Sequence, residues 1–174
     1  GLVAQADKKT GKIHTNFKQN ITATGRISST EPNLQNIPVR TEQGREIRRV
    51  FIPSEQGRVL AVADYSQIEL RVLAHIADDE HMIATFNKGG DIHTSTAGEV
   101  FGVRLEDVTP QMRSAAKAVN FGIVYGIGDF GLGRQLKIPR AQAAEYIEKY
   151  LARYPKVHAF MQQSVEDCKR DGYV

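Results

Sequence analysis

The stretch richest in chemically useful side chains is residues 109–126, TPQMRSAAKAVNFGIVYG. Four of them recur at intervals of four residues: Arg113, Lys117, Phe121 and Tyr125. In an α-helix, steps of four drift by about 40° each, so these side chains form one slanting stripe. Cations one turn apart can hold neighbouring phosphates, and an aromatic ring can support a base or a sugar. The stripe would fit a nucleoside triphosphate, but taken alone it is more typical of a half-buried helix with solvated cations and with both rings in a core. A second motif upstream favours the nucleotide site.

A second stretch, residues 58–78, places an acid between a predicted strand and a predicted helix. The apolar run 59–63 is typical of a buried strand, Asp64 stands where it ends, and Ser66 begins the helix. A carboxylate at the end of a strand is a common position for a metal-binding acid. The apolar residues predicted on the buried side of this helix are Ile68, Leu70, Val72, Leu73 and Ile76.

Together the two stretches resemble motifs A and B of the family A DNA polymerases. Residues 64–71, DYSQIELR, are similar to motif A, and the stripe with Gly122 and Gly126 is similar to motif B. Residues 24–26, TGR, and residues 33–38, NLQNIP, resemble two further signatures of the family. The matches cover most of the chain from residue 14 onward.

The resemblance implies an α+β fold that is predominantly helical. Residues 1–76 would form part of the palm subdomain, an antiparallel sheet plus a helix that carries motif A. Residues 77–174 would form the helical fingers subdomain with the motif B helix. The implied partners are primer-template DNA and deoxynucleoside triphosphates.

The resemblance also implies roles in two-metal deoxynucleotidyl transfer to a primer 3′-hydroxyl. Asp64 would bind two Mg²⁺ ions, helped by the backbone carbonyl of Tyr65, and Asp64 and Lys117 would be the catalytic residues. The implied nucleotide-binding residues are Gln67, Glu69, His93, Arg113, Lys117, Phe121 and Tyr125. The implied DNA-binding residues are Arg26, Asn33, Gln35, Asn36 and Tyr125.

Three of these residues carry more specific expectations. In the family, the residue matching Glu69 excludes a ribose 2′-hydroxyl and lies near the motif B tyrosine. Ser66 and Glu69 also form an S-x-x-E capping box, so both roles stay open. Phe121, where some members have Tyr, goes with discrimination against dideoxynucleotides. His93 would face the β-phosphate, although a lone histidine is more often structural.

Other segments have structural interpretations. Acidic residues 78–80 are predicted to be a solvated helix end, and the glycines after residue 126 are predicted to form a flexible turn. Residues 31–38 are predicted to be a loop, where the asparagines bond their own backbone or contact DNA. Basic residues surround a predicted turn at 43–44, either as phosphate contacts or as an exposed hairpin: Arg40, Arg45, Arg48 and Arg49.

The remaining helices are predicted from caps and periodicity. Asp91 is placed to cap the helix that follows it. Two amphipathic helices flank Pro155, and Gly172 ends the second. We expect these last two helices to be scaffold.

Composition permits a nucleic-acid partner. The 174 residues include 25% charged and 41% hydrophobic residues with a net charge of +3, and the pI is about 9.0. The sequence shows no apolar run near 18 residues, so we expect no membrane span. Cys168 is the single cysteine, which excludes an internal disulfide and fits a reducing cytoplasm. We expect a monomer in the cytoplasm, associated with the nucleoid.

One family signature is missing. The second metal-binding carboxylate of the family lies in motif C, an apolar strand with His-Asp-Glu, and no such segment occurs here. We therefore expect this chain to be inactive alone. One alternative is a non-catalytic nucleic-acid or nucleotide-binding module. Another is a small-molecule kinase, but the missing Walker loop and the missing kinase signatures disfavour the kinase.

Overall fold

The computed structural model describes residues 2–38 and 41–173. The chain divides into two compact units, Gly1–Ala63 (unit 1) and Asp64–Val174 (unit 2). The palm and fingers boundary after residue 76 stays a prediction, and Arg40 lies outside the described residues.

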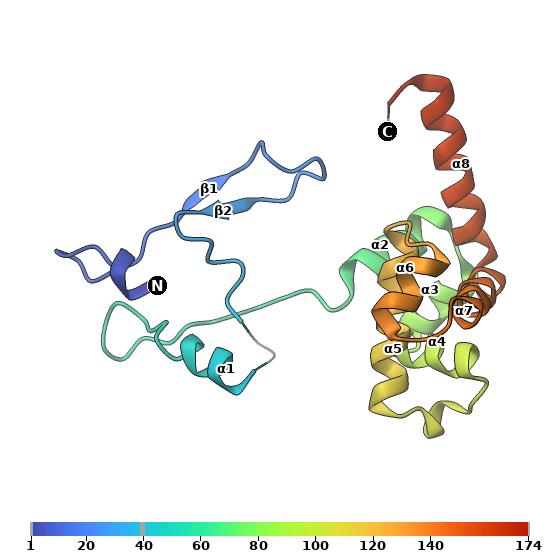
Figure 1. Cartoon of the computed structure of the whole chain (residues 1–174), viewed down its shortest axis with the longest axis horizontal. Coiled ribbons are helices and arrows are strands. Elements are labelled where there is room, and N and C mark those ends of the chain that lie inside the picture. The colour runs from blue at the N-terminus through green and yellow to red at the C-terminus, as the bar shows by residue number, and fades with distance from the viewer. Residues whose placement is uncertain (1, 39–40, 174) are drawn as a thin grey trace. The chain divides into compact units, whose positions relative to one another are not determined.

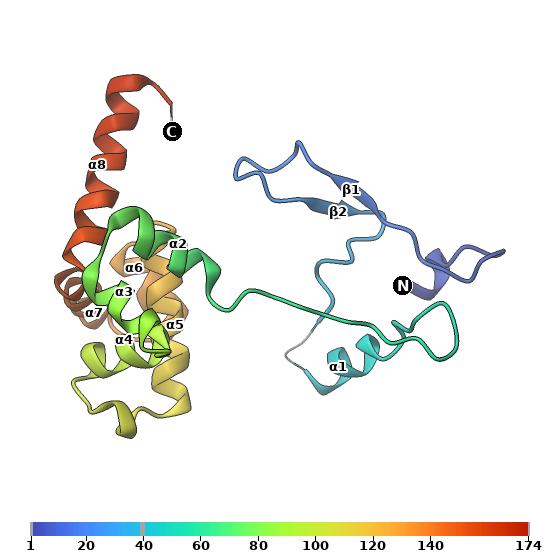
Figure 2. The same ribbon diagram turned by 180° about the vertical axis from the view of Figure 1, so that it is seen from behind.

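Unit 1 contains little regular structure. A 3₁₀-helix, η1, spans Leu2–Gln5, and strands β1 (Asn16–Lys18) and β2 (Ser28–Thr30) pair antiparallel with Phe17 opposite Ser29. Figures 1 and 2 show the two strands as a short hairpin. Residues 31–38 form a loop, as predicted.

The predicted turn at residues 43–44 is wrong, because these residues lie in helix α1, Glu42–Arg48. The Thr41 hydroxyl accepts a hydrogen bond from the Gly44 amide at 3.0 Å and so caps the helix. A Cβ on Gly44 would lie 2.6 Å from the Cβ of Pro38, so glycine here permits close packing.

The predicted strand at residues 59–63 is also absent. Val59, Leu60 and Val62 are exposed, and none of the described strands pairs with this segment. A strand needs a neighbour to satisfy its backbone groups, and an apolar run cannot supply that neighbour itself.

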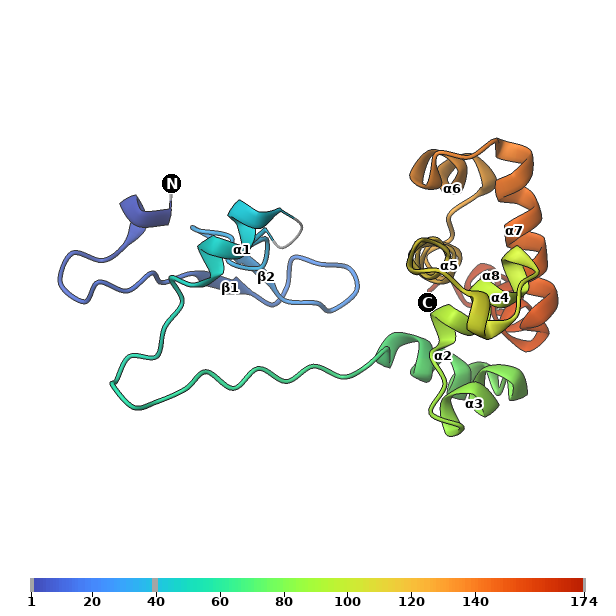
Figure 3. The same ribbon diagram turned by 90° about the horizontal axis from the view of Figure 1, so that it is seen from below.

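Unit 2 is helical. Its elements are α2 (Ile68–Ala77), α3 (Glu80–Asn87), α4 (Ile92–Phe101), η2 (Leu105–Asp107), α5 (Pro110–Val124), α6 (Asp129–Leu136), α7 (Arg140–Arg153) and α8 (Pro155–Asp171). Helix α5 packs against α4, α6 and α7, and Figure 3 looks nearly along its axis. The apolar core of the unit includes Leu70, Met82, Ile92, Val119 and Leu132.

Helix α5 confirms the predicted boundaries. The Thr109 hydroxyl accepts a hydrogen bond from the Met112 amide at 3.2 Å, and Pro110 occupies the first turn. Gly126 follows the helix end with φ +75°, a conformation that favours glycine.

Helix α2 differs from its prediction in two ways. It begins at Ile68, and its N-cap Gln67 has φ +55° and makes no side-chain capping bond, so the Ser66 capping box does not form. Leu70 and Leu73 are buried, but three predicted core residues are largely exposed: Ile68, Val72 and Ile76. Five apolar positions spread too widely around one helix to face its neighbours α3 and α8 together.

The acids after α2 are not all solvated. Asp79 is 1% exposed, and its carboxylate accepts from the amides of Met82 at 3.1 Å and Lys156 at 3.2 Å. It therefore caps α3 and holds the start of α8. A buried carboxylate is tolerated because both oxygens are hydrogen-bonded.

The glycines after residue 126 are not all in a turn, since Gly131 and Gly133 lie within α6. A Cβ on Gly131 would lie 2.7 Å from the side chain of Ile127. These glycines allow close packing more than flexibility.

The last two helices are confirmed. Pro155 begins α8, and Gly172 caps it with φ +81°. Glu145 and Lys149 form the predicted surface pair at 2.8 Å. Within residues 2–38 and 41–173, none of the helices has the length and apolar character needed to cross a membrane.

Candidate nucleotide and metal site

Three side chains of the predicted stripe lie on α5 and the fourth directly follows it. Lys117 is exposed, Phe121 is half-buried, and Tyr125 is the C-cap residue. The rings of Phe121 and Tyr125 stack with centroids 6.3 Å apart and an interplanar angle of 17°. The helix thus presents a cation followed by two aligned aromatic faces.

A pocket of about 300 Å³ gathers most of the predicted site residues in unit 2. Lys117 and Phe121 of α5 reach it together with Asp64, which is exposed. The lining residues are Asp64, Tyr65, Gln67, Ile68, Glu69, His93, Lys117 and Phe121. Residues from three separate segments therefore meet at one cavity that holds both an acid and a cation.

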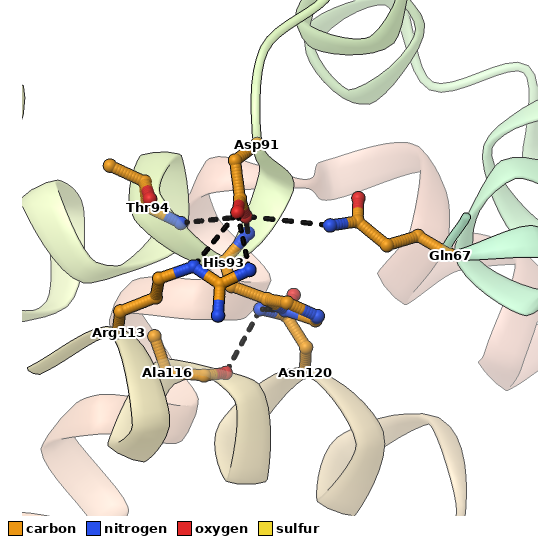
Figure 4. A network of polar contacts seen from close by, with 7 residues as sticks. All are labelled: Gln67, Asp91, His93, Thr94, Arg113, Ala116 and Asn120. Carbon is orange, nitrogen blue, oxygen red and sulfur yellow. Dashed lines mark hydrogen bonds and ion pairs between the residues drawn. The ribbon is translucent and has the colours of Figure 1, made fainter. Parts of the chain in front are cut away.

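Arg113 is not among these lining residues, because its guanidinium turns to Asp91. Its Nε lies 2.8 Å and its Nη2 2.5 Å from the same Asp91 oxygen, Oδ2 (Figure 4). The other oxygen accepts from the amides of His93 at 2.8 Å and Thr94 at 3.2 Å, which confirms Asp91 as the cap of α4. Gln67 lies at the limit of hydrogen-bond distance, 3.5 Å from that oxygen.

These contacts decide the charge of Asp91. Burial alone would raise the pKa of this carboxyl, but hydrogen bonds from Arg113 and the two backbone amides outweigh it and lower the pKa. Asp91 is therefore a carboxylate at neutral pH and links the start of α4 to the stripe on α5.

Tyr125 is joined to the pocket through Glu69. The phenol donates a hydrogen bond to Glu69 Oε2 at 2.5 Å and so connects the end of α5 to α2. The proximity of these two residues, which the resemblance implies, is present. Because Glu69 contacts Tyr125 and lines the pocket, its carboxylate is fixed at the pocket wall.

His93 is 2% exposed and lies within the wall of the pocket. Its ring packs against Phe121 with centroids 5.7 Å apart, and its Nδ1 lies 3.2 Å from the Asn120 side-chain nitrogen. Burial lowers the pKa of this imidazole; Asp91 raises it, and Arg113 and Lys117 lower it further. The net lowering favours a neutral ring.

The predicted DNA-binding residues, apart from Tyr125, lie in unit 1, and the structure shows mainly their local roles. Asn33 accepts a hydrogen bond from the Gln35 amide at 3.0 Å, which is turn chemistry, and the Gln35 side chain donates to the Ile27 carbonyl at 2.9 Å. Arg26 and Asn36 are exposed. A role of these residues in DNA binding stays a prediction.

Asp64 and Tyr65 are the candidate metal donors of unit 2. The Asp64 carboxylate and the Tyr65 carbonyl are hard oxygen donors of the kind that Mg²⁺ prefers. Among residues 2–38 and 41–173 there is no cluster of three His, Cys, Asp or Glu side chains that could hold a metal. The donor chemistry fits Mg²⁺, and the described part of the chain supplies part of a ligand set.

A larger pocket of about 640 Å³ lies elsewhere in unit 2. Its walls come mainly from apolar side chains of α5, α7 and α8, such as Ile123, Leu151 and Met161. It contains none of the predicted site residues. The smaller pocket is the candidate site because it brings an acid, a cation and an aromatic ring together.

Sequence reasoning missed two residues. Asp91 was predicted only as a helix cap, and nothing in its spacing indicates the ion pair with Arg113. Asn120 was not singled out, although a signal existed. It occupies the same helical face as Ala116, Val119 and Ile123, where an apolar residue is expected, and it is fully buried.

Comparison with known proteins identifies the family. The sequence profile of DNA polymerase family A matches residues 1–174. The chain is 57% identical over 174 residues to DNA polymerase I of Geobacillus stearothermophilus, covering all of this chain and 20% of that protein. It is 54% identical over 173 residues to the thermostable DNA polymerase I of Thermus thermophilus, covering 99% of this chain and 21% of that protein.

A solved structure is similar throughout. It is the POL domain of Pol1 from M. smegmatis in complex with DNA primer-template and dNTP, with a TM-score of 0.88 and 43% identity. The match covers 99% of this chain and 30% of that chain. This chain spans about a fifth of the length of the curated relatives that it matches. The chain belongs to DNA polymerase family A.

Proposed function

We propose that this chain forms the nucleotide-binding part of a template-directed DNA polymerase. A primer 3′-hydroxyl attacks the α-phosphorus of a deoxynucleoside triphosphate, and pyrophosphate leaves. The observation that carries the proposal is that Asp64, Lys117 and Phe121 line one pocket. Similarity to DNA polymerase I proteins and to a POL domain with primer-template and dNTP supports it.

Two cations on α5 would bind the triphosphate. Lys117 reaches the pocket directly and would neutralise charge that gathers on the transferring phosphoryl group. Arg113 is engaged by Asp91, so a phosphate that binds it must share or replace this ion pair. Asp91 therefore holds the guanidinium ready beside the pocket and also competes with the nucleotide for it.

Asp64, with the Tyr65 carbonyl, would hold Mg²⁺. When bound, Mg²⁺ supplies positive charge that favours the attacking and leaving oxygens. Asp64 suits this role because its carboxylate is exposed at the pocket and can be reached by an ion. Further ligands would come from outside the described residues, since no cluster of three candidate ligands occurs among them.

The aromatic residues and Glu69 would select the sugar. Phe121 would pack on the sugar and base, and Glu69, tied to Tyr125, would exclude a ribose 2′-hydroxyl. We expect the parent enzyme to use ribonucleotides and dideoxynucleotides poorly. Arg26, Asn33, Gln35 and Asn36 would contact primer-template DNA.

Primer extension with Mg²⁺ by the complete product of this reading frame tests the proposal. Asp64→Asn should lower the extension rate more than about a hundredfold, because it removes a metal-binding charge. The matched control is Asp107→Asn, the same change at an exposed acid of η2, which should extend at the unmodified rate. Deoxy-, ribo- and dideoxynucleotides are offered in parallel.

The alternative function is a non-catalytic nucleotide- or nucleic-acid-binding module. Absence of extension by a well-folded protein that still binds nucleotide or DNA would favour it. Equal rates for Asp64→Asn and its control would contradict the metal role of Asp64 while leaving polymerisation itself intact.

A further inference from the structure

Asn120 is a buried amide inside the α5 face that otherwise packs apolar side chains. It is fully buried, and its side chain forms hydrogen bonds with Thr96, Ala116 and His93. A buried amide without partners would be costly, so the hydrogen bonds of Asn120 need to be accounted for. Its contacts lead to His93, which lines the candidate site.

The orientation of the Asn120 amide is determined by its neighbours. Its nitrogen donates to the Ala116 carbonyl at 2.9 Å, and its oxygen accepts from the Thr96 hydroxyl at 3.2 Å. Rotating the amide group by 180° would bring the Asn120 side-chain oxygen against the Ala116 carbonyl oxygen. Both atoms are acceptors, so no hydrogen bond could form between them. The second hydrogen of the amide nitrogen therefore remains for His93 Nδ1, 3.2 Å away.

The Thr96 hydroxyl also lies near a second buried hydroxyl. Its oxygen lies 3.5 Å from the Tyr154 hydroxyl, in the buried interior between α4 and α7. The chain of contacts thus runs from Tyr154 through Thr96 and Asn120 to the ring of His93. Figure 4 shows the hydrogen bond from Asn120 to the Ala116 carbonyl and, nearby, the pairing of Arg113 with Asp91.

We propose that Asn120 is a positioning residue that fixes the tautomer of His93, so that Nδ1 accepts and Nε2 carries the hydrogen. A nitrogen that accepts a hydrogen bond cannot carry a proton in the neutral ring. Nε2 has no hydrogen-bond partner within the part of the chain that the structure describes. The ring would then offer one N–H donor to an anionic group in the pocket. This inference rests on the proposed function, in which that group is a phosphate of the nucleotide.

Two further features favour this arrangement. Packing against Phe121 at 5.7 Å restricts rotation of the imidazole, so the donor keeps one direction. Burial lowers the pKa of His93, Asp91 opposes this, and Arg113 and Lys117 add to it. Asp91 caps α4, and Arg113 and Lys117 lie on α5; the lowered pKa favours the neutral ring, the state in which the tautomer matters.

The tautomer can be measured directly. Histidine labelled with ¹⁵N in the ring is incorporated into the 174-residue chain, and long-range ¹H–¹⁵N correlation spectra identify His93 by comparison with His93→Gln. We expect one protonated nitrogen at Nε2 and one unprotonated nitrogen at Nδ1. A proton on Nδ1 in the unmodified chain would overturn the proposal.

Variants at Asn120 test its control of the ring. Asn120→Leu should produce a mixture of the two tautomers, and Asn120→Asp should protonate both nitrogens, because a carboxylate beside Nδ1 favours a proton there. The matched control is Asn87→Asp, the same change at an exposed position. An unchanged His93 spectrum in both Asn120 variants would contradict the proposal.

A double-mutant cycle separates positioning from a merely structural role. In the complete reading frame, Asn120→Leu should weaken nucleotide affinity about two- to fivefold, the size expected for one weakened hydrogen bond. In a His93→Ala background the same change should have no further effect. An equal loss in both backgrounds would show that Asn120 acts only on the structure. No effect of His93→Ala on affinity would contradict the phosphate role of His93, and the spectra would still report the tautomer.

Discussion

Unit 1 and unit 2 differ in what holds them together. Among the described residues of unit 1, only Ser29 and Gly44 are buried, and its apolar side chains Val59, Leu60 and Val62 face solvent. All of the buried hydrophobic side chains that are described belong to unit 2. Unit 1 is therefore organised by local hydrogen bonds and turns, whereas unit 2 has a core that can position a site.

The two units should differ most in how much stability they lose when a large apolar side chain is truncated. Leu70→Ala in unit 2 should lower the free energy of unfolding by about 2–5 kcal/mol, because Leu70 is fully buried and leaves a cavity. Leu60→Ala in unit 1, at a side chain that is 58% exposed, should change it by less than about 0.5 kcal/mol. Urea unfolding followed by circular dichroism measures both, and similar losses would break the comparison.

Removing a helix cap in each unit should give the next largest difference in stability. Asp79→Ala should cost about 2–3 kcal/mol, since it removes two hydrogen bonds from a buried site where α3 and α8 begin. Thr41→Ala, which removes the single cap of α1, should cost about 1 kcal/mol and reduce helix content only locally. Hydrogen exchange locates each loss, and protection lost across unit 2 in the Thr41 variant would contradict the separation.

Acid should affect unit 2 through His93. Burial lowers the pKa of His93 in the folded chain, so the unfolded chain, with the ordinary pKa of 6.5, binds more protons. Stability should therefore be constant above about pH 7 and fall as pH drops through 6.5 toward the folded pKa. His93→Gln should remove this slope, which one group can make no steeper than about 1.4 kcal/mol per pH unit.

The control for this slope is His14→Gln in unit 1, where the side chain is exposed. Asp91 affects stability in a lower pH range. Burial would raise its pKa, but Arg113 and two backbone amides lower the pKa overall. Its contribution to the stability of the folded chain is therefore present above pH 3.8 and lost at lower pH. A slope between pH 5 and 7 that survives His93→Gln would show that another group is responsible.

The smallest effect should come from an exposed contact inside unit 2. Tyr125→Phe removes the hydrogen bond to Glu69, but the ring is 63% exposed, so we expect a loss of about 0.5–1 kcal/mol. Tyr173→Phe, at a ring that is 73% exposed, is the control and should be neutral. A loss above about 2 kcal/mol would mean that the contact between α5 and α2 supports the core.

The sequence determined the features that depend on neighbouring residues. Thr109 and Pro110 begin α5, Asp91 caps α4, and Gly172 ends α8, because caps and breakers act within one turn. The fourfold spacing likewise placed Lys117 and Phe121 on one side of α5, and both line the pocket.

Only the tertiary structure decided the features that join distant segments. Asn120 meets His93 across 27 residues, and Asp79 meets Lys156 across 77. The same limit explains the errors: an apolar run does not reveal whether a partner strand exists. Hydrophobic burial and cavity packing depend on which surfaces meet, and no local pattern contains that information.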